Sequence, residues 1–426
     1  MRRAVIPGAI PGALSRATLP LALILASPRL AGAAEGYPDI EFHGLLDARV
    51  VRTPDDRSAF DGGLGKLRTG GDPGTRTTTL AEASLMATAH LMPGLDVYTH
   101  VRAEGEQRTA VDIIEAYARW RPVPTGPLAW QVKAGAFFPP LSLENDGLAW
   151  TSRYTLTPSA INSWVGEELR TEGSEVTLTW RPEGLGGSRF DLIGAVFAGN
   201  DGTGEMLDYR GWGLVERPAG LLDALRLPDE VAFHQGRSPP VRFQPFAEID
   251  HQPGFYVGGR WTDPSAGELS YLHWDNRADP TITNGKAYAW ATYFDSLGYK
   301  IMPAPGLTLL AQAMRGGTTV QPTIATESEG YFEALYLLIS QEWGRFRLSG
   351  RFDAFGTHED TPVTFRPHFD EHGKAYTAAL SYRPLAWMRW TVEWVHVDSR
   401  RQQRLNVNLP IEAHENQAQL GVRLFF

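Results

Sequence analysis

Three histidines near the start of the chain have a residue type and spacing that could support catalysis or metal binding. His43, His90 and His100 fall on the polar rows of three segments that read as successive β-strands. Imidazoles that face one side of adjacent strands can act as a general base or hold a metal ion. However, the chain lacks the Gly-x-Ser-x-Gly motif that presents a serine nucleophile. Histidines on the water-facing side of a strand are usually solvated and have no catalytic role. We therefore expect no catalytic residue and no metal, and an enzyme stays open only as an alternative.

The other patterns that suggest chemistry fail on residue type or charge. Residues 62–67 (GGLGKL) resemble a phosphate-binding loop, but Leu67 replaces the Ser or Thr that would hold Mg²⁺. The chain has no cysteine, so disulfides and thiolate metal sites are excluded. Its 40 basic residues stand against 49 acidic ones, whereas a nucleic-acid partner requires a basic field. We expect no nucleic-acid partner and no cofactor.

Alternating hydrophobicity predicts the elements that position these residues. The C-terminal NQAQLGVRLFF places Leu420, Val422, Leu424 and Phe426 on one face and mostly polar side chains on the other. A period of two is typical of a strand with one apolar and one wet face. We expect sixteen such strands, at roughly 40–51, 78–91, 95–104, 110–121, 128–138, 174–181, 189–198, 254–262, 268–276, 287–301, 306–316, 330–343, 345–356, 373–383, 386–399 and 414–426.

The connections between these strands are of two kinds. Short turns containing Pro or Gly alternate with long polar loops, as in a meander of hairpins whose tight turns share one end. Sixteen strands place both chain ends on the tight-turn side. If two segments within 199–253 pair with each other, the number becomes eighteen.

Two packed soluble sheets are the alternative architecture for such a pattern. Tryptophans near the tight turns favour a membrane barrel, because aromatic residues gather at the membrane interfaces. They are Trp120, Trp130, Trp180, Trp261, Trp343 and Trp387.

The first 33 residues have the features of a secretory signal peptide. Arg2 and Arg3 precede a short apolar core at 18–26, and Ala31-Gly32-Ala33 supplies small residues for cleavage. No segment reaches the ~18 consecutive apolar residues of a transmembrane helix. We expect one mature domain, residues 34–426, with 36 basic residues (40 minus the 4 in the signal) and 49 acidic ones.

The signal peptide, the missing cysteines and a terminal strand that stops on Phe426 together resemble the bacterial outer-membrane β-barrels. The resemblance implies an all-β fold: a closed, antiparallel, up-and-down transmembrane barrel in the outer-membrane lipid of a Gram-negative cell. It also implies that Leu420, Val422, Leu424 and Phe426 are the assembly signal read by the barrel-assembly machinery.

A second resemblance lies in KAGAFFPPLSLE, residues 133–144, and in DIIEAYARW, residues 112–120. Both are similar to segments of the phosphate-selective O and P type porins and related substrate-specific porins. The resemblance covers roughly residues 80–172, and it implies that loop 138–172 folds into the lumen as a constriction, with 199–253 as a long external loop. The charged residues of the constriction loop are Glu144, Asp146, Arg153, Glu167, Glu168 and Arg170. The chain has only five lysines, which argues against phosphate specificity.

These observations predict a porin that lets small hydrophilic solutes, with anions as the candidate charge class, diffuse passively through a water-filled barrel. The candidate pore-lining residues are Arg49, Arg102, Arg119, Lys133, Arg181, Arg347, Arg351 and Arg389, of which Arg102, Arg119 and Lys133 form the candidate anion-attracting patch. A homotrimer is the assembly considered. A plugged barrel that acts as an adhesin or structural protein stays open, as does the outer-membrane enzyme.

Overall fold

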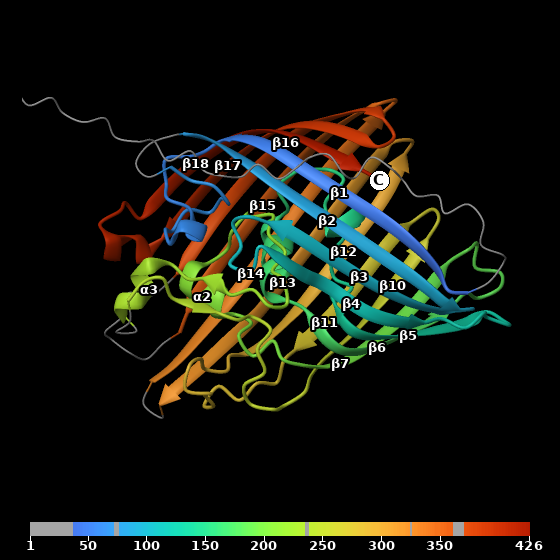
Figure 1. The fold of residues 1–426 in the computed structure, drawn as a ribbon, viewed down its shortest axis with the longest axis horizontal. Helices are drawn as coiled ribbons and strands as arrows, with labels where there is room; N and C mark the ends of the chain where they lie inside the picture. The colour runs from blue at the N-terminus through green and yellow to red at the C-terminus, as the bar shows by residue number, and fades with distance from the viewer. Residues whose placement is uncertain (1–36, 72–75, 235–237, 324–325, 361–369) are drawn as a thin grey trace, which may run out of the picture. The chain divides into compact units, whose positions relative to one another are not determined.

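The described residues of the chain form a closed β-barrel (Figure 1). The structure is a computed structural model, and it describes residues 37–426 except 72–75, 235–237, 324–325 and 361–369. Sixteen of the described strands close the barrel, each antiparallel to its neighbours, which confirms the predicted architecture. The expected signal peptide, residues 1–33, lies outside the described residues.

The barrel strands follow one another around the wall in chain order, and β1 pairs with β18 to close it. Their bounds are β1 Asp39–Arg52, β2 Thr77–Met92, β3 Leu95–Glu104, β4 Val111–Trp120, β5 Leu128–Phe137, β6 Thr171–Trp180, β7 Arg189–Ala198, β10 Gly254–Asp263, β11 Gly267–Asp275, β12 Ala291–Ala304, β13 Leu307–Thr323, β14 Thr326–Trp343, β15 Phe346–Glu359, β16 Glu371–Leu385, β17 Met388–Arg401 and β18 Glu412–Phe425.

Two sequence expectations about strands need correction. The short strands β8 (Leu225–Arg226) and β9 (Arg242–Phe243) pair only with each other in a separate sheet, so the eighteen-strand alternative is wrong. The expected strands 306–316 and 330–343 are too short, because β13 extends to Thr323 and β14 begins at Thr326. Thr318 and Val320 are β-branched and stay in register with Gly330 and Ser328.

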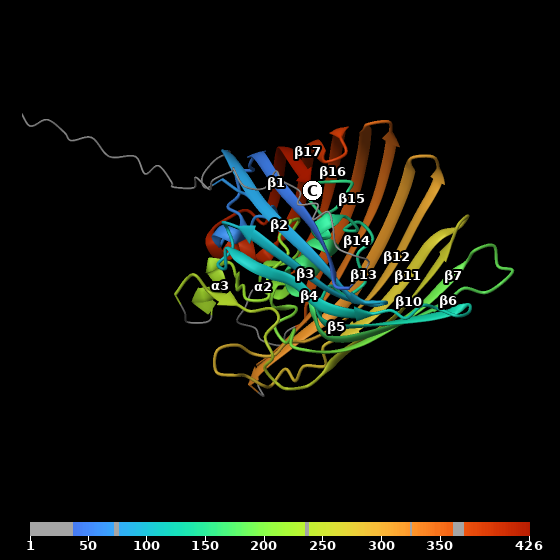
Figure 2. The same ribbon diagram turned by 45° about the vertical axis from the view of Figure 1, so that its right-hand side comes forward.

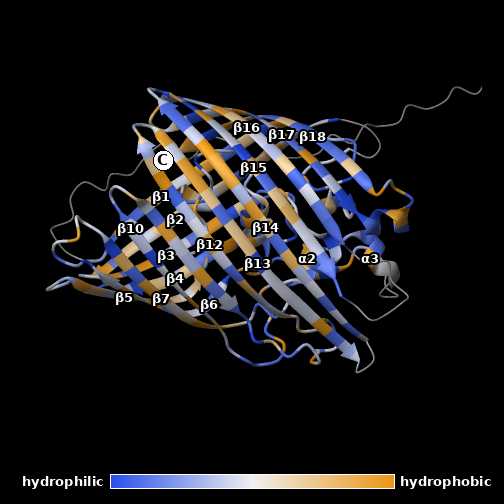
Figure 3. Ribbon diagram, turned by 180° about the vertical axis from the view of Figure 1, so that it is seen from behind, coloured by the Kyte–Doolittle hydropathy of each residue, from blue (hydrophilic) through white to orange (hydrophobic). Residues whose placement is uncertain are grey.

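The alternation of side chains separates an outer from an inner face of the wall. On β14, Leu335, Leu337 and Ile339 are 39%, 54% and 54% exposed, whereas Tyr336 and Leu338 between them are buried. Successive side chains of a strand point to opposite faces, so the exposed apolar row lies on the outside, where Figure 3 shows hydrophobic stretches along the wall. Such an apolar outer band is what a barrel wall facing lipid requires.

The tight-turn end of the barrel carries the expected aromatic residues. The turns at 93–94, 264–266, 305–306, 344–345 and 386–387 all lie at this end. Five of the six expected tryptophans border it as exposed side chains, as in an interfacial girdle: Trp120, Trp130, Trp180, Trp343 and Trp387. The sixth, Trp261, is half-buried.

The barrel closes where its first strand meets its last residue. The backbones of Gly44 and Phe426 exchange two hydrogen bonds, at 2.8 and 3.1 Å. A Cβ on Gly44 would lie 1.8 Å from the Phe426 ring, so the missing side chain of Gly44 makes room for that ring. The terminal strand is therefore part of the closing seam.

The described helices are short and belong to the connections. They are α1 (Ala160–Glu168), α2 (Glu205–Arg210) and α3 (Asp229–His234), with 3-10 turns at Ala59–Asp61, Leu148–Trp150 and Gln402–Val407. Among the residues that the structure describes, none of them is long and apolar enough to cross a membrane. Helices α2 and α3 gather at the end of the barrel opposite the tight turns (Figure 2), whereas α1 packs against β14.

Candidate functional site: the barrel lumen

Two long loops fold back into the barrel, and we call them the first lumen loop (138–170) and the second lumen loop (199–253). Every residue from 154 to 170 and every residue from 199 to 220 is buried. Their partners include inward-facing residues of β1, β15, β17 and β18. These two loops therefore occupy much of the lumen.

The wall residue Arg351 of β15 holds the first lumen loop in place. Its guanidinium donates a hydrogen bond to the Thr157 carbonyl at 2.7 Å and lies 3.3 Å from the Glu144 carboxylate. Glu144 in turn accepts a hydrogen bond from the Ser159 backbone N–H at 2.7 Å. Ser159 caps α1 by accepting a hydrogen bond from the Asn162 N–H, a role that serine favours. The start of α1 is thus fixed to the wall by buried polar contacts.

Two adjacent glutamates join the first lumen loop to the second. Glu167 pairs with both terminal nitrogens of Arg210, at 2.9 and 2.7 Å. The Glu168 carboxylate accepts hydrogen bonds from the Met206 N–H at 3.0 Å, near the start of α2, and from the indole N–H of Trp164. These contacts form the junction between α1 and α2.

Ionisable groups at this junction have shifted pKa values, and they lie outside the membrane-spanning strands. Burial raises the pKa of Glu168 to about 8, and the charge of Glu167 adds to the shift. Burial also lowers the pKa of Lys66 to about 8, although its Nζ lies 2.5 Å from Glu371. Lys66 belongs to the loop between β1 and β2, which also reaches the lumen. The Lys66 Nζ donates a hydrogen bond to the Arg210 carbonyl at 3.1 Å.

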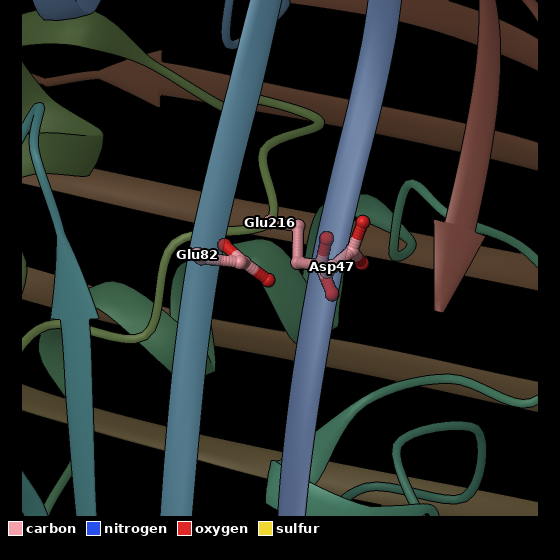
Figure 4. Close-up of side chains that lie close together, drawn as sticks. All are labelled: Asp47, Glu82 and Glu216. Atoms are coloured by element: carbon pink, nitrogen blue, oxygen red, sulfur yellow. The ribbon is translucent and has the colours of Figure 1, made fainter. Parts of the chain in front are cut away.

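A charge network fixes the second lumen loop to the first strands of the wall. Asp47 of β1, Glu82 of β2 and Glu216 of the loop lie close together (Figure 4). Arg423 lies 2.6 Å from Asp47 and 2.7 Å from Glu216, and Arg49 pairs with the same two carboxylates. Glu82 is paired as well, by Arg102 and Arg68. We call these three acids and their arginines the lumen network. Each of its carboxylates is paired with arginine, which balances the negative charge without a metal ion.

Aromatic side chains occupy the lumen between α1 and strands β12–β14. The Trp164 ring lies 5.4 Å from Phe294, 5.2 Å from Phe332 and 6.0 Å from Trp212, and all four side chains are buried. The alternation of polar and apolar residues predicts inward rows that face water, and it does not indicate this cluster. The run ALYLLI at 334–339, apolar on both faces of its strand, was the signal that could have indicated it.

The lumen is more open at the tight-turn end, where several basic side chains are partly exposed. The exposed fractions are 32% for Arg119, 16% for Lys133 and 19% for Arg347. Arg119 lies 2.8 Å from Asp96, and Lys133 lies 3.2 Å from Glu175.

Arg389 stands out among these basic residues. It donates to the Arg153 carbonyl at 3.4 Å, and its guanidinium lies 5.2 Å from the centre of the Phe425 ring. Within the described ranges it has no acidic partner. Arg153 and Lys300 share the single carboxylate of Asp146, at 2.7 and 3.0 Å. Basic groups therefore outnumber acids where the first lumen loop faces this opening.

The remaining candidates from the sequence fall in three places. Arg49, Arg102 and Arg351 face inward as expected, but they are only 5%, 3% and 3% exposed because ion pairs and loops cover them. Arg181 lies in an exposed turn after β6. Arg170 is buried, with its guanidinium 3.6 Å from the centre of the Phe138 ring.

The three histidines all face the lumen side but do not form one group. His43 is exposed near the start of β1, and His90 lies 2.6 Å from Asp96. His100 is completely buried. In the described part of the chain, the groups that could hold a metal ion consist of carboxylates alone.

Comparisons with known proteins agree with this architecture. No protein-family model matches the chain, and no curated protein matches its sequence. Solved structures do match. The outer membrane channel DcaP of Acinetobacter baumannii is 10% identical, with 92% of this chain and 99% of that chain covered and a TM-score of 0.58.

Two further structures have the same arrangement. OmpF of Salmonella typhi, in complex with daunomycin, is 12% identical over 91% of this chain and 97% of that chain, with a TM-score of 0.50. A loop L8 deletion mutant of OmpT, an outer membrane protein of Vibrio cholerae, is 10% identical over 91% and 99%, with a TM-score of 0.50. At sequence identities this low, the structural matches show the fold alone. With its closed sixteen-stranded wall and an inserted loop, the chain has the fold of the bacterial outer-membrane porins.

Proposed function

We propose that the chain is an outer-membrane channel through which small hydrophilic solutes diffuse passively. The observation that supports this best is the charged, partly exposed opening at the tight-turn end, which leads to the first lumen loop. Closed barrels of this strand number are wide enough for an aqueous channel, and the two lumen loops narrow it. Buried ion pairs hold both loops inside the barrel, so we expect a low conductance.

Anions are the solute class that the opening favours. Arg389 has no acidic partner among the described residues, and Arg347, Arg153 and Lys300 share only Glu342 and Asp146. Rings of like charge set the selectivity of a pore. The candidate patch from the sequence is weaker support, because Glu82, Asp96 and Glu175 neutralise Arg102, Arg119 and Lys133. The likeness to phosphate-selective porins stays a prediction.

A plugged barrel is the second candidate, and a specific observation favours it. The aromatic cluster around Trp164 and the buried residues 199–220 fill much of the lumen. If these loops never move, the barrel serves as an adhesin or structural protein. An enzyme has less support, since His43, His90 and His100 form no common group.

The remaining proposals concern biogenesis and assembly. Export through the signal peptide at 1–33, recognition of Leu420, Val422, Leu424 and Phe426 by the barrel-assembly machinery, and a homotrimer complete the proposed function. Removal of the signal is tested by the N-terminal sequence of outer-membrane material. The mass of the detergent-solubilised protein tests the trimer.

Swelling of proteoliposomes separates the channel from the plugged barrel. Vesicles that contain the channel should swell in isotonic solutions of a small sugar and of a small organic anion, and faster in the anion. Vesicles that contain a plugged barrel should behave like protein-free vesicles in both solutions. Equal swelling in anionic and cationic solutes would retain the channel and reject its charge preference.

A further inference from the structure

A second group of three carboxylates lies within the second lumen loop. One oxygen each of Asp201, Glu248 and Asp250 lies within 4.8 Å of the others. Asp201 is completely buried, and the other two are half-buried. The backbone N–H groups of Gly199 and His251 donate to Glu248, at 2.7 and 2.6 Å. The loop therefore holds these three side chains in a fixed arrangement.

Unlike the lumen network, this group has no lysine or arginine among the described residues to balance its charge. No lysine or arginine of the described chain forms an ion pair with any of the three. The nearest basic group is the Nδ1 of His251, 4.0 Å from Glu248 on a side chain that is 88% exposed. Burial, and the nearby charges of Asp250 and Glu248, raise the pKa of Asp201 to about 6. At neutral pH the group concentrates negative charge in a partly buried place.

The Asp201 carboxylate also has an oxygen without a partner. Its Oδ2 accepts hydrogen bonds from the backbone N–H groups of Ile249 and Asp250, at 2.5 and 3.2 Å. Its Oδ1 is buried and accepts no hydrogen bond from the described residues. Buried polar atoms in folded proteins are nearly always paired, so this oxygen indicates a further ligand.

We propose that Asp201, Glu248 and Asp250 bind a divalent cation of the calcium class. Calcium takes six to eight oxygen ligands, with carboxylates preferred and water completing the shell. Three carboxylates without sulfur or imidazole ligands match that chemistry and not that of zinc or copper. The bound ion would balance the charge of the group and satisfy Asp201 Oδ1.

The three carboxylates lie on two segments of the second lumen loop, and both segments contact a third one, residues 279–290. The Trp290 N–H donates to the Asp201 carbonyl at 2.7 Å, and the Asp279 N–H donates to Asp250. The Asp201 N–H itself donates to the Ala247 carbonyl at 3.1 Å. Binding would therefore stabilise the part of the second lumen loop that contacts residues 279–290. This proposal does not depend on whether the barrel conducts.

The test uses terbium, which takes the same oxygen ligands as calcium, on the complete folded barrel in detergent. We expect saturable, tryptophan-sensitised terbium emission at one ion per chain, displaced by calcium and reduced in Trp290→Phe. Asp201→Asn and Glu248→Gln should each weaken binding by roughly tenfold or more, since each removes a ligand charge. Glu268→Gln is the matched control, because Glu268 lies at the tight-turn end and pairs with Arg260 at 3.2 Å.

Folding of each variant is checked by its heat-modifiable mobility, and Glu248→Gln serves if Asp201→Asn does not fold. A calcium-dependent rise in the melting temperature of the parent, lost in Glu248→Gln, would support the site a second time. The proposal is overturned if parent, Asp201→Asn and Glu248→Gln bind terbium equally. A folded parent with neither saturable emission nor any calcium effect on melting would overturn it too.

Discussion

The two ends of the barrel lumen differ in what their inward residues meet. Toward the long-loop end, Arg49 and Arg102 are buried in ion pairs beneath the lumen loops. Arg351, nearer the tight turns on β15, is covered in the same way by the first lumen loop. At the tight-turn end, Arg347 is partly exposed and Arg389 has no acidic partner among the described residues. Strand β15 supplies both a buried arginine, Arg351, and a partly exposed one, Arg347. The loops and not the wall therefore decide which arginines are structural.

This difference separates two roles for arginine that look alike in the sequence. A buried arginine paired with a loop carboxylate positions that loop, and its charge is cancelled locally. A partly exposed arginine without a partner projects its charge into the opening, where it can act on a passing ion.

The largest effect should come from the seam that closes the wall. Gly44→Ala would place a methyl group 1.8 Å from the Phe426 ring, so we expect a several-fold loss of heat-modifiable, membrane-inserted protein. Phe426→Asp should reduce assembly in the same assay, because it removes the aromatic end of the apolar row. Gly350→Ala is the control, since its new methyl would meet only Ile339 at 3.7 Å. Equal yields from Gly44→Ala and Gly350→Ala would contradict this account of the seam.

A smaller but measurable effect is expected at the anchor of the second lumen loop. Glu216→Gln leaves Arg49 and Arg423 with less compensating charge in a buried place, which should cost about 2–3 kcal/mol of unfolding free energy. Urea unfolding measures the loss, and bilayer recordings should show more frequent openings. Glu106 is the control, because its side chain is 45% exposed and lies 3.3 Å from Arg68. Glu106→Gln should change the free energy of unfolding by less than about 1 kcal/mol. If both variants lose the same amount, the anchor has no special role.

Charge reversal at the tight-turn end should alter selectivity without altering stability. Arg389→Glu and Arg347→Glu should each move the reversal potential toward cation preference, more strongly in dilute salt where screening is weaker. Arg119→Glu and Lys133→Glu should act in the same direction but less, because Asp96 and Glu175 already offset them. Arg181→Glu, in an exposed turn, should have no effect. An equal shift from Arg181→Glu would show that only net charge matters.

The smallest effect is a pH dependence at the junction of the loops. Because burial raises the pKa of Glu168 from 4.5 to about 8, folding favours its neutral form. The stabilisation is complete below the ordinary pKa and is lost as the pH rises through about 8. Opening events should therefore increase between pH 7 and 9, and Glu168→Gln should remove that increase. Lys66, whose pKa is also about 8, accounts for any change that persists in Glu168→Gln.

The sequence was sufficient to predict the wall, because apolar and polar side chains alternate along each barrel strand. Leu335, Leu337 and Ile339 on one face of β14 need only their spacing to indicate an outer row. The tight turns and the strand count then place both chain ends together. The same rule failed at 317–329, where residues with polar side chains and high strand propensity were taken for a loop.

The lumen was less predictable, because alternation tells which face a side chain occupies but not what covers that face. Arg351 meets Glu144 and Arg49 meets Glu216 only after loops more than 150 residues away in the chain have folded inward. Trp164 and Phe332 join in an aromatic cluster for the same reason. The three carboxylates at Asp201, Glu248 and Asp250 were not predicted as a group because they lie on a loop without periodicity.

Single-channel conductance in planar bilayers tests the central claim most directly, when the parent is compared with a variant that lacks residues 142–166. The account predicts small, anion-preferring openings for the parent. It predicts a several-fold larger conductance for the variant, because the deletion removes most of α1 and the contacts of Glu144 with Arg351. A parent and a correctly folded variant that are both silent would contradict the channel and establish the plugged barrel.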